Sequence, residues 1–227
     1  MEGDLGVKLY DTTLRDGAQR EGLSLSVEDK LKILHRLDDF GIHYVECGYP
    51  ASNPKDAELF RRLKELELKK AVPVAFGATR RALVGAEQDK GLEELLRADT
   101  PAVCLVGKTW DLHVRTALQT QLDENLFMIS DSVDYVKRHG REVFYDAEHF
   151  FDAYKSNPRY ALKTVQAAVE AGADWVCLCD TNGGSLPVET LVGIEKAQGS
   201  LPDARFGVHY HDDVGTAVAS SLGAVEA

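Results

Sequence analysis

Short apolar runs rich in β-branched residues alternate with amphipathic segments along the whole chain. The amphipathic segments carry apolar residues at helical spacing, and the runs recur at intervals of about 30 to 40 residues. Strands that alternate with helices in this way are typical of βαβ units and a parallel sheet. The predicted strands are Val7–Thr13, Tyr44–Gly48, Val72–Phe76, Val103–Val106, Glu142–Ala147, Trp175–Asp180 and Arg205–His211.

Two of the predicted helices begin with clear capping patterns. Ser26-x-x-Asp29 forms a capping box ahead of a helix that reaches Phe40, and Asn157 followed by Pro158 is typical of an N-cap and a first helical position. No linker, low-complexity tract or charge block divides the chain, so we predict a single domain over residues 1–227. Further helices are predicted near Asp56–Glu67, Leu92–Arg97, Glu124–Arg138, Val188–Lys196 and Ala217–Ala227.

Such a sheet can close in two ways, as an open doubly wound sheet or as a (β/α)8 barrel. Side chains alternate along a strand, so His209 and His211 share one face of the last predicted strand. Glu46 and Glu148 stand at the carboxyl ends of the second and fifth strands. A barrel builds its site from the ends of several strands, whereas an open sheet concentrates ligand contacts at one switch point. We therefore predict an α/β fold of the TIM (β/α)8 type.

The predicted barrel is truncated after the seventh strand and helix. The seventh helical segment reaches Glu226-Ala227, where the sequence stops. An unclosed parallel barrel would expose long hydrophobic edges, which suits a soluble protein poorly. We therefore expect an incomplete catalytic barrel domain, with the eighth strand and the C-terminal regions absent, that belongs to a longer chain.

Composition and charge narrow the classes of protein. The 227 residues are 44% hydrophobic and carry a formal net charge of −11, which argues against a nucleic-acid binder or a membrane-surface protein. No run approaches the ~18 apolar residues of a spanning helix, and the N-terminus lacks the features of a signal peptide. The four cysteines lie in apolar runs and resemble small buried thiols, so we expect a reducing, cytoplasmic location.

Candidate metal ligands lie at both ends of the chain. His209 and His211 would be about 7 Å apart at Cα on one strand face, near enough to share an ion. The bland alternative is a pair of core histidines bonded to backbone. Near the N-terminus, Arg15 and Asp16 precede a glycine in one turn, where a carboxylate could bind a hard cation. Two nitrogens and one oxygen would suit Mg²⁺, Mn²⁺, Co²⁺ or Zn²⁺.

Three motifs in order carry a resemblance to a known superfamily. They are Leu9–Gln19 (LYDTTLRDGAQ), Val45–Pro50 (VECGYP) and His209–Gly215 (HYHDDVG). With these motifs the chain resembles the DRE-TIM metallolyase superfamily, and within it the 2-isopropylmalate, homocitrate and citramalate synthases. The segments Phe76–Arg81 (FGATRR) and Tyr145–Asp152 (YDAEHFFD) look most like the citramalate synthase branch.

The resemblance implies a metal-dependent acyltransferase of branched-chain amino-acid (isoleucine or leucine) biosynthesis. It would condense acetyl-CoA with an α-keto acid by a Claisen-type reaction and then hydrolyse the thioester. Pyruvate, giving citramalate, is favoured over 2-oxoisovalerate or 2-oxoglutarate, and a homodimer is expected for the full-length protein. By motif position, the metal ligands would be Asp16, His209 and His211; the catalytic residues would be Arg15, Glu46 and Glu148; and the substrate would meet Arg15, Gln19 and Thr181.

Each of these roles has a structural alternative. Arg15 could simply neutralise Asp11 or Asp16, and Glu46 could be a buried carboxylate bonded to backbone. Glu148 could be a solvated strand-end residue. Likewise, Thr181 and Gln19 could serve only a cap or a turn, and paired Arg80 and Arg81 could meet CoA phosphates but are more often solvated.

Other functions also stay open. A lyase of the hydroxymethylglutaryl-CoA type would use the same ligands in the cleavage direction, and a non-catalytic metal-binding barrel would not need Arg15 beside Asp16. The sequence also departs from the superfamily, which usually has Asn where Asp212 and Ser220 stand here. The family's glycine-rich segment after the eighth strand is missing, so we expect the 227-residue chain alone to be inactive.

Overall fold

A computed structural model describes residues 6–227. Its strands are β1 (Tyr10–Asp11), β2 (Tyr44–Gly48), β3 (Val72–Ala78), β4 (Ala102–Lys108), β5 (Glu142–Glu148), β6 (Trp175–Asp180) and β7 (Phe206–Tyr210). Its α-helices are α1 (Val27–Phe40), α2 (Pro54–Leu63), α3 (Lys90–Arg97), α4 (Asp111–Thr116), α5 (Leu122–Arg138), α6 (Phe150–Ser156), α7 (Pro158–Glu170), α8 (Pro187–Ser200) and α9 (Ala217–Glu226). Single 3₁₀ turns cover Gly17–Gln19 and Ala86–Gln88.

The strand order in the sheet is the order in the chain, from β1 to β7. The chain divides into two compact units, which are described separately. Unit 1 comprises the residues up to Gly77 together with Lys90–Cys104, and unit 2 comprises Ala78–Asp89 together with Leu105–Ala227. Within unit 1, β1 pairs with β2 and β2 with β3, and within unit 2, β5 pairs with β6 and β6 with β7; all four pairings are parallel.

The helices of unit 1 begin and end where the sequence provides caps. The Ser26 side chain accepts the backbone N–H of Asp29, whose carboxylate accepts the N–H of Ser26, so the predicted capping box is present. Gly41 ends α1 in the left-handed conformation, at φ 93°. Helix α1 packs against α2, and their apolar faces cover the core around β2 and β3. Buried members of this core include Leu34, Val45, Leu59, Phe60 and Val74.

A buried carboxylate near the C-terminus of α1 is hydrogen-bonded to the segment before β3. Asp38 is only 4% exposed, and its oxygens accept the backbone N–H groups of Lys69, Lys70 and Ala71 at 2.8 to 2.9 Å. Burial alone would raise the pKa of Asp38, but these three hydrogen bonds outweigh it and lower the pKa below its ordinary value. The side chain therefore ties a helix end to the start of a strand.

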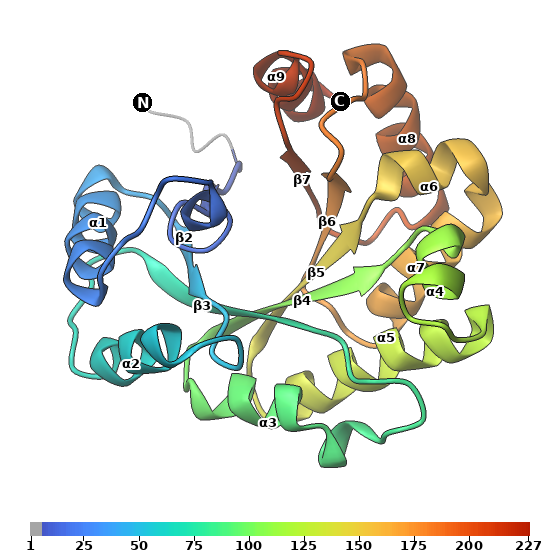
Figure 1. Ribbon diagram of the computed structural model, residues 1–227. Helices are drawn as coiled ribbons and strands as arrows, with labels where there is room; N and C mark the ends of the chain where they lie inside the picture. The colour runs from blue at the N-terminus through green and yellow to red at the C-terminus, as the bar shows by residue number, and fades with distance from the viewer. Residues whose placement is uncertain (1–5) are drawn as a thin grey trace. The chain divides into compact units, whose positions relative to one another are not determined.

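Unit 2 surrounds the strands β5, β6 and β7 with the later helices. Helix α5 packs against α7, α6 packs against α7 and α8, and α9 packs against α8 and β7, as Figure 1 shows for each neighbouring pair. The core of this unit is formed by side chains that are almost fully buried on the strands and on α5 to α7: Val143, Tyr145, Val176, Leu178, Ile129, Val133, Phe150 and Val165.

Several predicted boundaries are wrong in detail. The first strand has two residues, Tyr10–Asp11, because Leu9 and Val7 are exposed and the chain turns at Thr12. The fourth strand runs on to Lys108, and the short helices α4 and α6 were not predicted, since six or seven residues carry too little periodicity. Among residues 6–227, no helix has both the length and the apolar character needed to cross a membrane.

Candidate active site

The Arg15 guanidinium is held on three sides within unit 1. Its Nε donates a short hydrogen bond to Oε1 of Glu46, and Nη1 lies 3.4 Å from Oδ2 of Asp16. The guanidinium carbon stands 3.8 Å from the centre of the Phe76 ring, a cation–π contact. The side chain is 11% exposed, so its orientation is fixed while one edge stays accessible.

Glu46 is completely buried, and each of its carboxylate oxygens accepts a hydrogen bond from another side chain. Oε1 faces Arg15, and the hydroxyl of Tyr10 donates to Oε2 at 2.7 Å. Burial raises the pKa of Glu46, while Arg15 and Tyr10 act in the opposite direction. Burial would lower the pKa of Arg15, but the attraction of Glu46 outweighs burial and the pKa is raised. Glu46 is thus bonded to side chains, and the alternative of a purely backbone-bonded carboxylate is wrong.

The turn after β1 explains how Arg15 and Asp16 project together. The carbonyl of Thr12 accepts the N–H groups of Arg15 and Gly17, both at 3.1 Å, and the fully buried Leu14 anchors the turn in the core. Asp16 is 25% exposed at its side chain. Arg15 and Gln19 line one pocket of about 520 Å³ in unit 1.

A buried ion pair forms another wall of that pocket. Nζ of Lys30 donates to Oδ1 of Asp56 at 2.6 Å, and the N–H of Tyr49 donates to Oδ2 at 3.0 Å. Gly48 makes this possible, because a Cβ there would lie 2.8 Å from the Asp56 carboxylate. The glycine of the second motif is therefore required by close approach at the register shift that ends β2.

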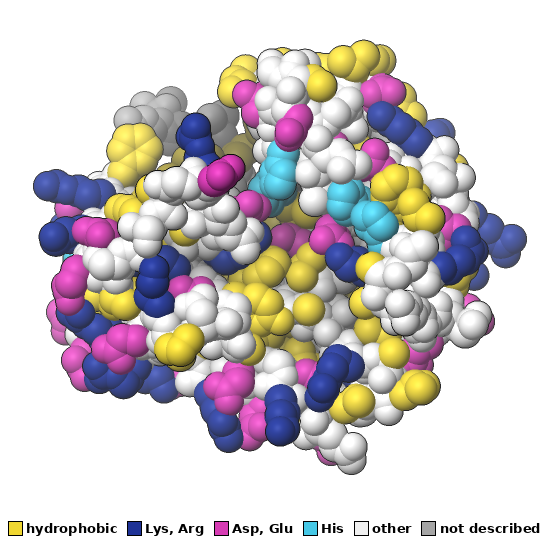
Figure 2. Space-filling view, viewed as in Figure 1, with side chains coloured by type: hydrophobic (Ala, Val, Ile, Leu, Met, Phe, Trp, Pro, Cys, Tyr) yellow, Lys and Arg dark blue, Asp and Glu magenta, His cyan; other side chains and the backbone are white. Residues whose placement is uncertain are grey.

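In unit 2, β7 presents the two predicted ligand histidines at its end. The rings of His209 and His211 are 5.3 Å apart between centroids, and both residues are partly exposed. Tyr210, between them, points to the opposite face and stacks on Phe151 at 5.7 Å. Figure 2 shows histidine side chains at the surface over the region where Figure 1 draws β5, β6 and β7. The alternation that the sequence predicted for this strand is confirmed.

The loop after β7 accounts for Asp212, which stands where the superfamily usually has Asn. Its Oδ1 accepts the N–H of Ala217 at 2.9 Å and so caps the first turn of α9, which an asparagine oxygen would do equally well. The next residue, Asp213, packs against Gly183, where a Cβ would lie 2.3 Å from its carboxylate. Gly183 has φ +60° and its carbonyl accepts the N–H of Val214, so the two loops interlock. The extra carboxylate, Asp212, thus has a structural partner.

Glu148 ends β5 and Thr181 follows β6, and His149, which the sequence analysis did not single out, contacts Thr181. His149 adopts the left-handed conformation at φ 56°, and its N–H donates to Oγ1 of Thr181 at 2.9 Å. Thr181 thus accepts one bond and keeps its own O–H to donate. Glu148 forms a short ion pair with Lys108, so the alternative of a merely solvated strand end is wrong. Lys108 was missed because the predicted fourth strand stopped at Val106.

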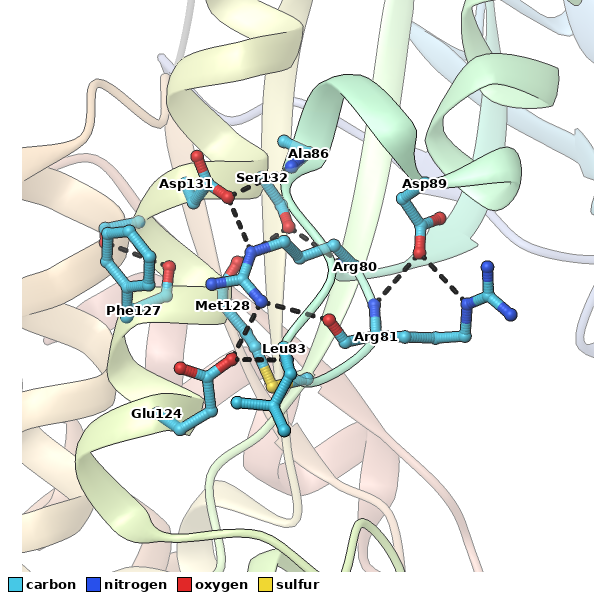
Figure 3. Close-up of polar contacts among 11 residues, drawn as sticks. Arg80, Arg81, Leu83, Ala86, Asp89, Glu124, Phe127, Met128, Asp131 and Ser132 are labelled. Carbon is cyan, nitrogen blue, oxygen red and sulfur yellow. Dashed lines mark hydrogen bonds and ion pairs between the residues drawn. The ribbon is translucent and has the colours of Figure 1, made fainter.

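Arg80 is a structural residue, contrary to the expectation of a solvated or phosphate-binding pair. Its side chain is 2% exposed, with Nε donating to Asp131 at 2.5 Å and Nη1 to Glu124 at 2.9 Å (Figure 3). The backbone N–H of Arg80 donates to Ser132 Oγ at 2.9 Å. Arg81 has a side chain that is 69% exposed and pairs with Asp89. Arg80 therefore fastens the segment between β3 and α3 to α5.

Comparison with known proteins adds three findings. The HMGL-like family model matches residues 6–227. The chain is 54% identical to the (R)-citramalate synthase of Aquifex aeolicus, covering 96% of this chain and 42% of that protein, and 36% identical to a probable 2-isopropylmalate synthase of Methanopyrus kandleri, covering 97% and 42%. The HMG-CoA lyase of Bacillus subtilis has a similar structure, with a TM-score of 0.80 and 20% identity over 97% of this chain and 73% of that one.

These likenesses fix the fold and the family. The chain spans about two fifths of the length of the curated synthases it matches. The strand order and the fold of the lyase confirm the prediction of a TIM-barrel type of α/β fold. The chain belongs to the HMGL-like family.

Proposed function

We propose that the protein carrying this chain is a metal-dependent citramalate synthase that condenses acetyl-CoA with pyruvate and hydrolyses the thioester. The observation that carries the proposal is the difference in identity between relatives: 54% to a citramalate synthase against 36% to a probable 2-isopropylmalate synthase over nearly the same length. The family resemblance read from the sequence points to the same branch.

Asp16, His209 and His211 would hold the divalent ion. The donor set fits, because the two imidazoles are adjacent at the end of β7 and Asp16 is partly exposed beside Arg15. Nitrogen and carboxylate ligands suit Mg²⁺, Mn²⁺, Co²⁺ or Zn²⁺. When bound, the ion would supply Lewis acidity toward the ketone and carboxylate oxygens of a chelating keto acid.

The protein's own groups would then divide the remaining work. Arg15 keeps the N–H groups of its outer edge for the keto-acid oxygen, where charge develops in the transition state. Glu46 fixes the plane of that guanidinium. Thr181 would donate its hydroxyl hydrogen to the substrate carboxylate, and Glu148 would take a proton from the weakly acidic thioester methyl. Gln19, on the Arg15 pocket, would contact the same substrate.

A homodimer and a cytoplasmic location complete the proposal. The homodimer rests on the family resemblance alone. The location rests also on Cys47, Cys104, Cys177 and Cys179, which form no disulfide within residues 6–227. The chain spans about two fifths of the curated synthases it matches, so the activity is proposed for the complete protein that carries it.

The test is a thiol-release assay of the complete protein with acetyl-CoA and a panel of keto acids. We expect release with pyruvate, little with 2-oxoisovalerate or 2-oxoglutarate, and citramalate as the product by mass spectrometry. One methylene in an apolar pocket changes the rate by about 10- to 200-fold, so the preference should be measurable. Release with 2-oxoisovalerate alone would assign a 2-isopropylmalate synthase, and cleavage of hydroxymethylglutaryl-CoA without condensation would assign a lyase; either result refutes the proposal.

A further inference from the structure

Lys108 is the last residue of β4, and Glu148 is the last residue of β5. In a parallel (β/α) barrel the carboxyl ends of the strands face the reacting groups. The ammonium of Lys108 forms a short hydrogen-bonded ion pair with Oε2 of Glu148. Within the described part of unit 2, this ammonium donates no other hydrogen bond. Two of its three N–H groups are therefore available to a ligand.

The pair is accessible without being fully solvated. The Lys108 side chain is 29% exposed and that of Glu148 is 22% exposed. A pair held only for stability gains little at such a site, because exposed ion pairs contribute about 0 to 1 kcal/mol. Binding of a ligand is a better explanation for a lysine at a strand end beside a candidate base.

Aromatic rings enclose the pair on one side. Trp110 and His113 follow β4 and lie with their rings 4.9 Å apart, and His113 meets the ring of His149 edge-on at 4.6 Å. Burial lowers the pKa of His113, and the neighbouring His149 and Lys108 lower it further, so this imidazole is neutral at pH 7. The nearby imidazole of His113 therefore does not compete with Lys108 as a cation.

The backbone beside Glu148 is strained in a way that functional sites commonly show. His149 has φ 56°, a conformation that costs about 1 kcal/mol or more for a residue with a Cβ. Its ring nitrogen Nδ1 lies 3.3 Å from Asp152, and Asn182 donates to the same carboxylate at 2.9 Å. Together with the bond to Thr181, these contacts fix the turn that follows Glu148.

We propose that Lys108 contacts the acyl thioester and stabilises its enolate oxygen, with Glu148 as the base. The inference deepens the proposed function and rests on it. In this step the methyl C–H bond of acetyl-CoA breaks, the proton passes to Glu148, and the electron pair forms a C=C bond as charge moves to the thioester oxygen. A free N–H of Lys108 donates to that oxygen. The charge leaves it again when the methylene carbon bonds to the keto carbon, whose oxygen then takes the proton from Glu148.

The experiment compares Lys108→Met with Lys137→Met in the complete protein. Lys137 is a matched control, because it pairs with Asp174 at 2.7 Å with side chains 32% and 30% exposed, at the opposite end of β5. We expect Lys108→Met to lower kcat for thiol release about 100-fold, the usual loss of one oxyanion donor, with the KM for pyruvate unchanged. Lys137→Met should stay within twofold of the wild type.

A double variant separates contact with substrate from mere support of Glu148. If Lys108 contacts the oxygen itself, Lys108→Met combined with Glu148→Gln should be at least tenfold slower than Glu148→Gln alone. Equal rates for these two variants, or a wild-type kcat in Lys108→Met, would overturn the inference. Should Lys108→Met fail to fold, Lys108→Ala decides, because it also removes every N–H donor of the side chain: a tenfold fall in kcat supports the contact, and wild-type kcat overturns it. A wild type that releases no thiol with any keto acid refutes the proposed function instead.

Discussion

Removing the Arg80 guanidinium should unfasten the segment between β3 and α3. Arg80→Met keeps most of the side-chain volume but leaves the carboxylates of Glu124 and Asp131 without their cation. It also removes the donor to the Arg81 carbonyl at 3.0 Å and the cation over the Phe127 ring at 4.9 Å. Figure 3 shows these groups converging on one guanidinium.

The magnitude follows from burial. Breaking a fully buried ion pair costs about 3 to 5 kcal/mol, because one charge is left without a partner. Here the arginine is 2% exposed, but Glu124 and Asp131 are 20% and 23% exposed and can regain some water. We therefore expect a loss of about 2 to 3 kcal/mol in the free energy of unfolding. For a chain of this size the melting temperature should fall by roughly 4 to 12 °C.

The assay is urea and thermal unfolding of the complete protein, with limited proteolysis of the same segment. Leu83 lies in the segment, is 91% exposed and has φ 62°, so cleavage near it should accelerate when the anchor is lost. Arg81→Met is the control, since that side chain is 69% exposed and should cost less than about 0.5 kcal/mol. Equal losses in the two variants, or no loss in Arg80→Met, would refute the assignment of Arg80 as a buried anchor.

Two further predictions concern a carboxylate and the metal. Asp38→Asn should lose about 1 to 3 kcal/mol of stability in urea unfolding, whereas Asp39→Asn, on the exposed side of the same helix, should lose almost none. The lowered pKa of Asp38 means that its contribution is complete above about pH 4 and is lost as pH falls through the folded-state pKa, a slope that Asp38→Asn should lack; an unchanged slope would contradict this. His211→Ala should abolish binding of Mn²⁺ or Co²⁺ measured calorimetrically, while His139→Ala, which removes an exposed imidazole on Tyr135, should not; retained binding in His211→Ala would refute the ligand set.

The sequence predicted correctly those features that depend on a few neighbouring residues, such as strand alternation and helix caps. The strand alternation around His209 and the capping box at Ser26 follow from side-chain geometry within a few residues, and both are present in the structure. The ends of strands were harder to place. Lys108 lies two residues beyond the apolar run of β4, so no pattern marked it as a strand residue.

Contacts between distant segments explain what the sequence could not supply. Arg80 is buried because Glu124 and Asp131, more than 40 residues later in the chain, meet it, as the separations of 44 and 51 residues record. A solvated arginine and a buried one have the same local sequence. The same holds for Gly48, whose need for a missing Cβ becomes visible only when the Asp56 carboxylate is in place.

The two readings of Arg15 that the sequence left open are compatible, because different atoms of one side chain serve them. Nε is committed to Glu46, whose second oxygen is committed to Tyr10, so the buried carboxylate has no oxygen to offer a substrate. In the proposed reaction, Glu46 would therefore act only through the guanidinium, which lies over the Phe76 ring. The outer edge of that guanidinium, pre-set by the buried pair, needs no reorganisation when charge develops beside it, which is the condition under which a fixed donor stabilises a transition state most. If the proposed function is correct, a structural ion pair is thus what would make Arg15 an efficient donor.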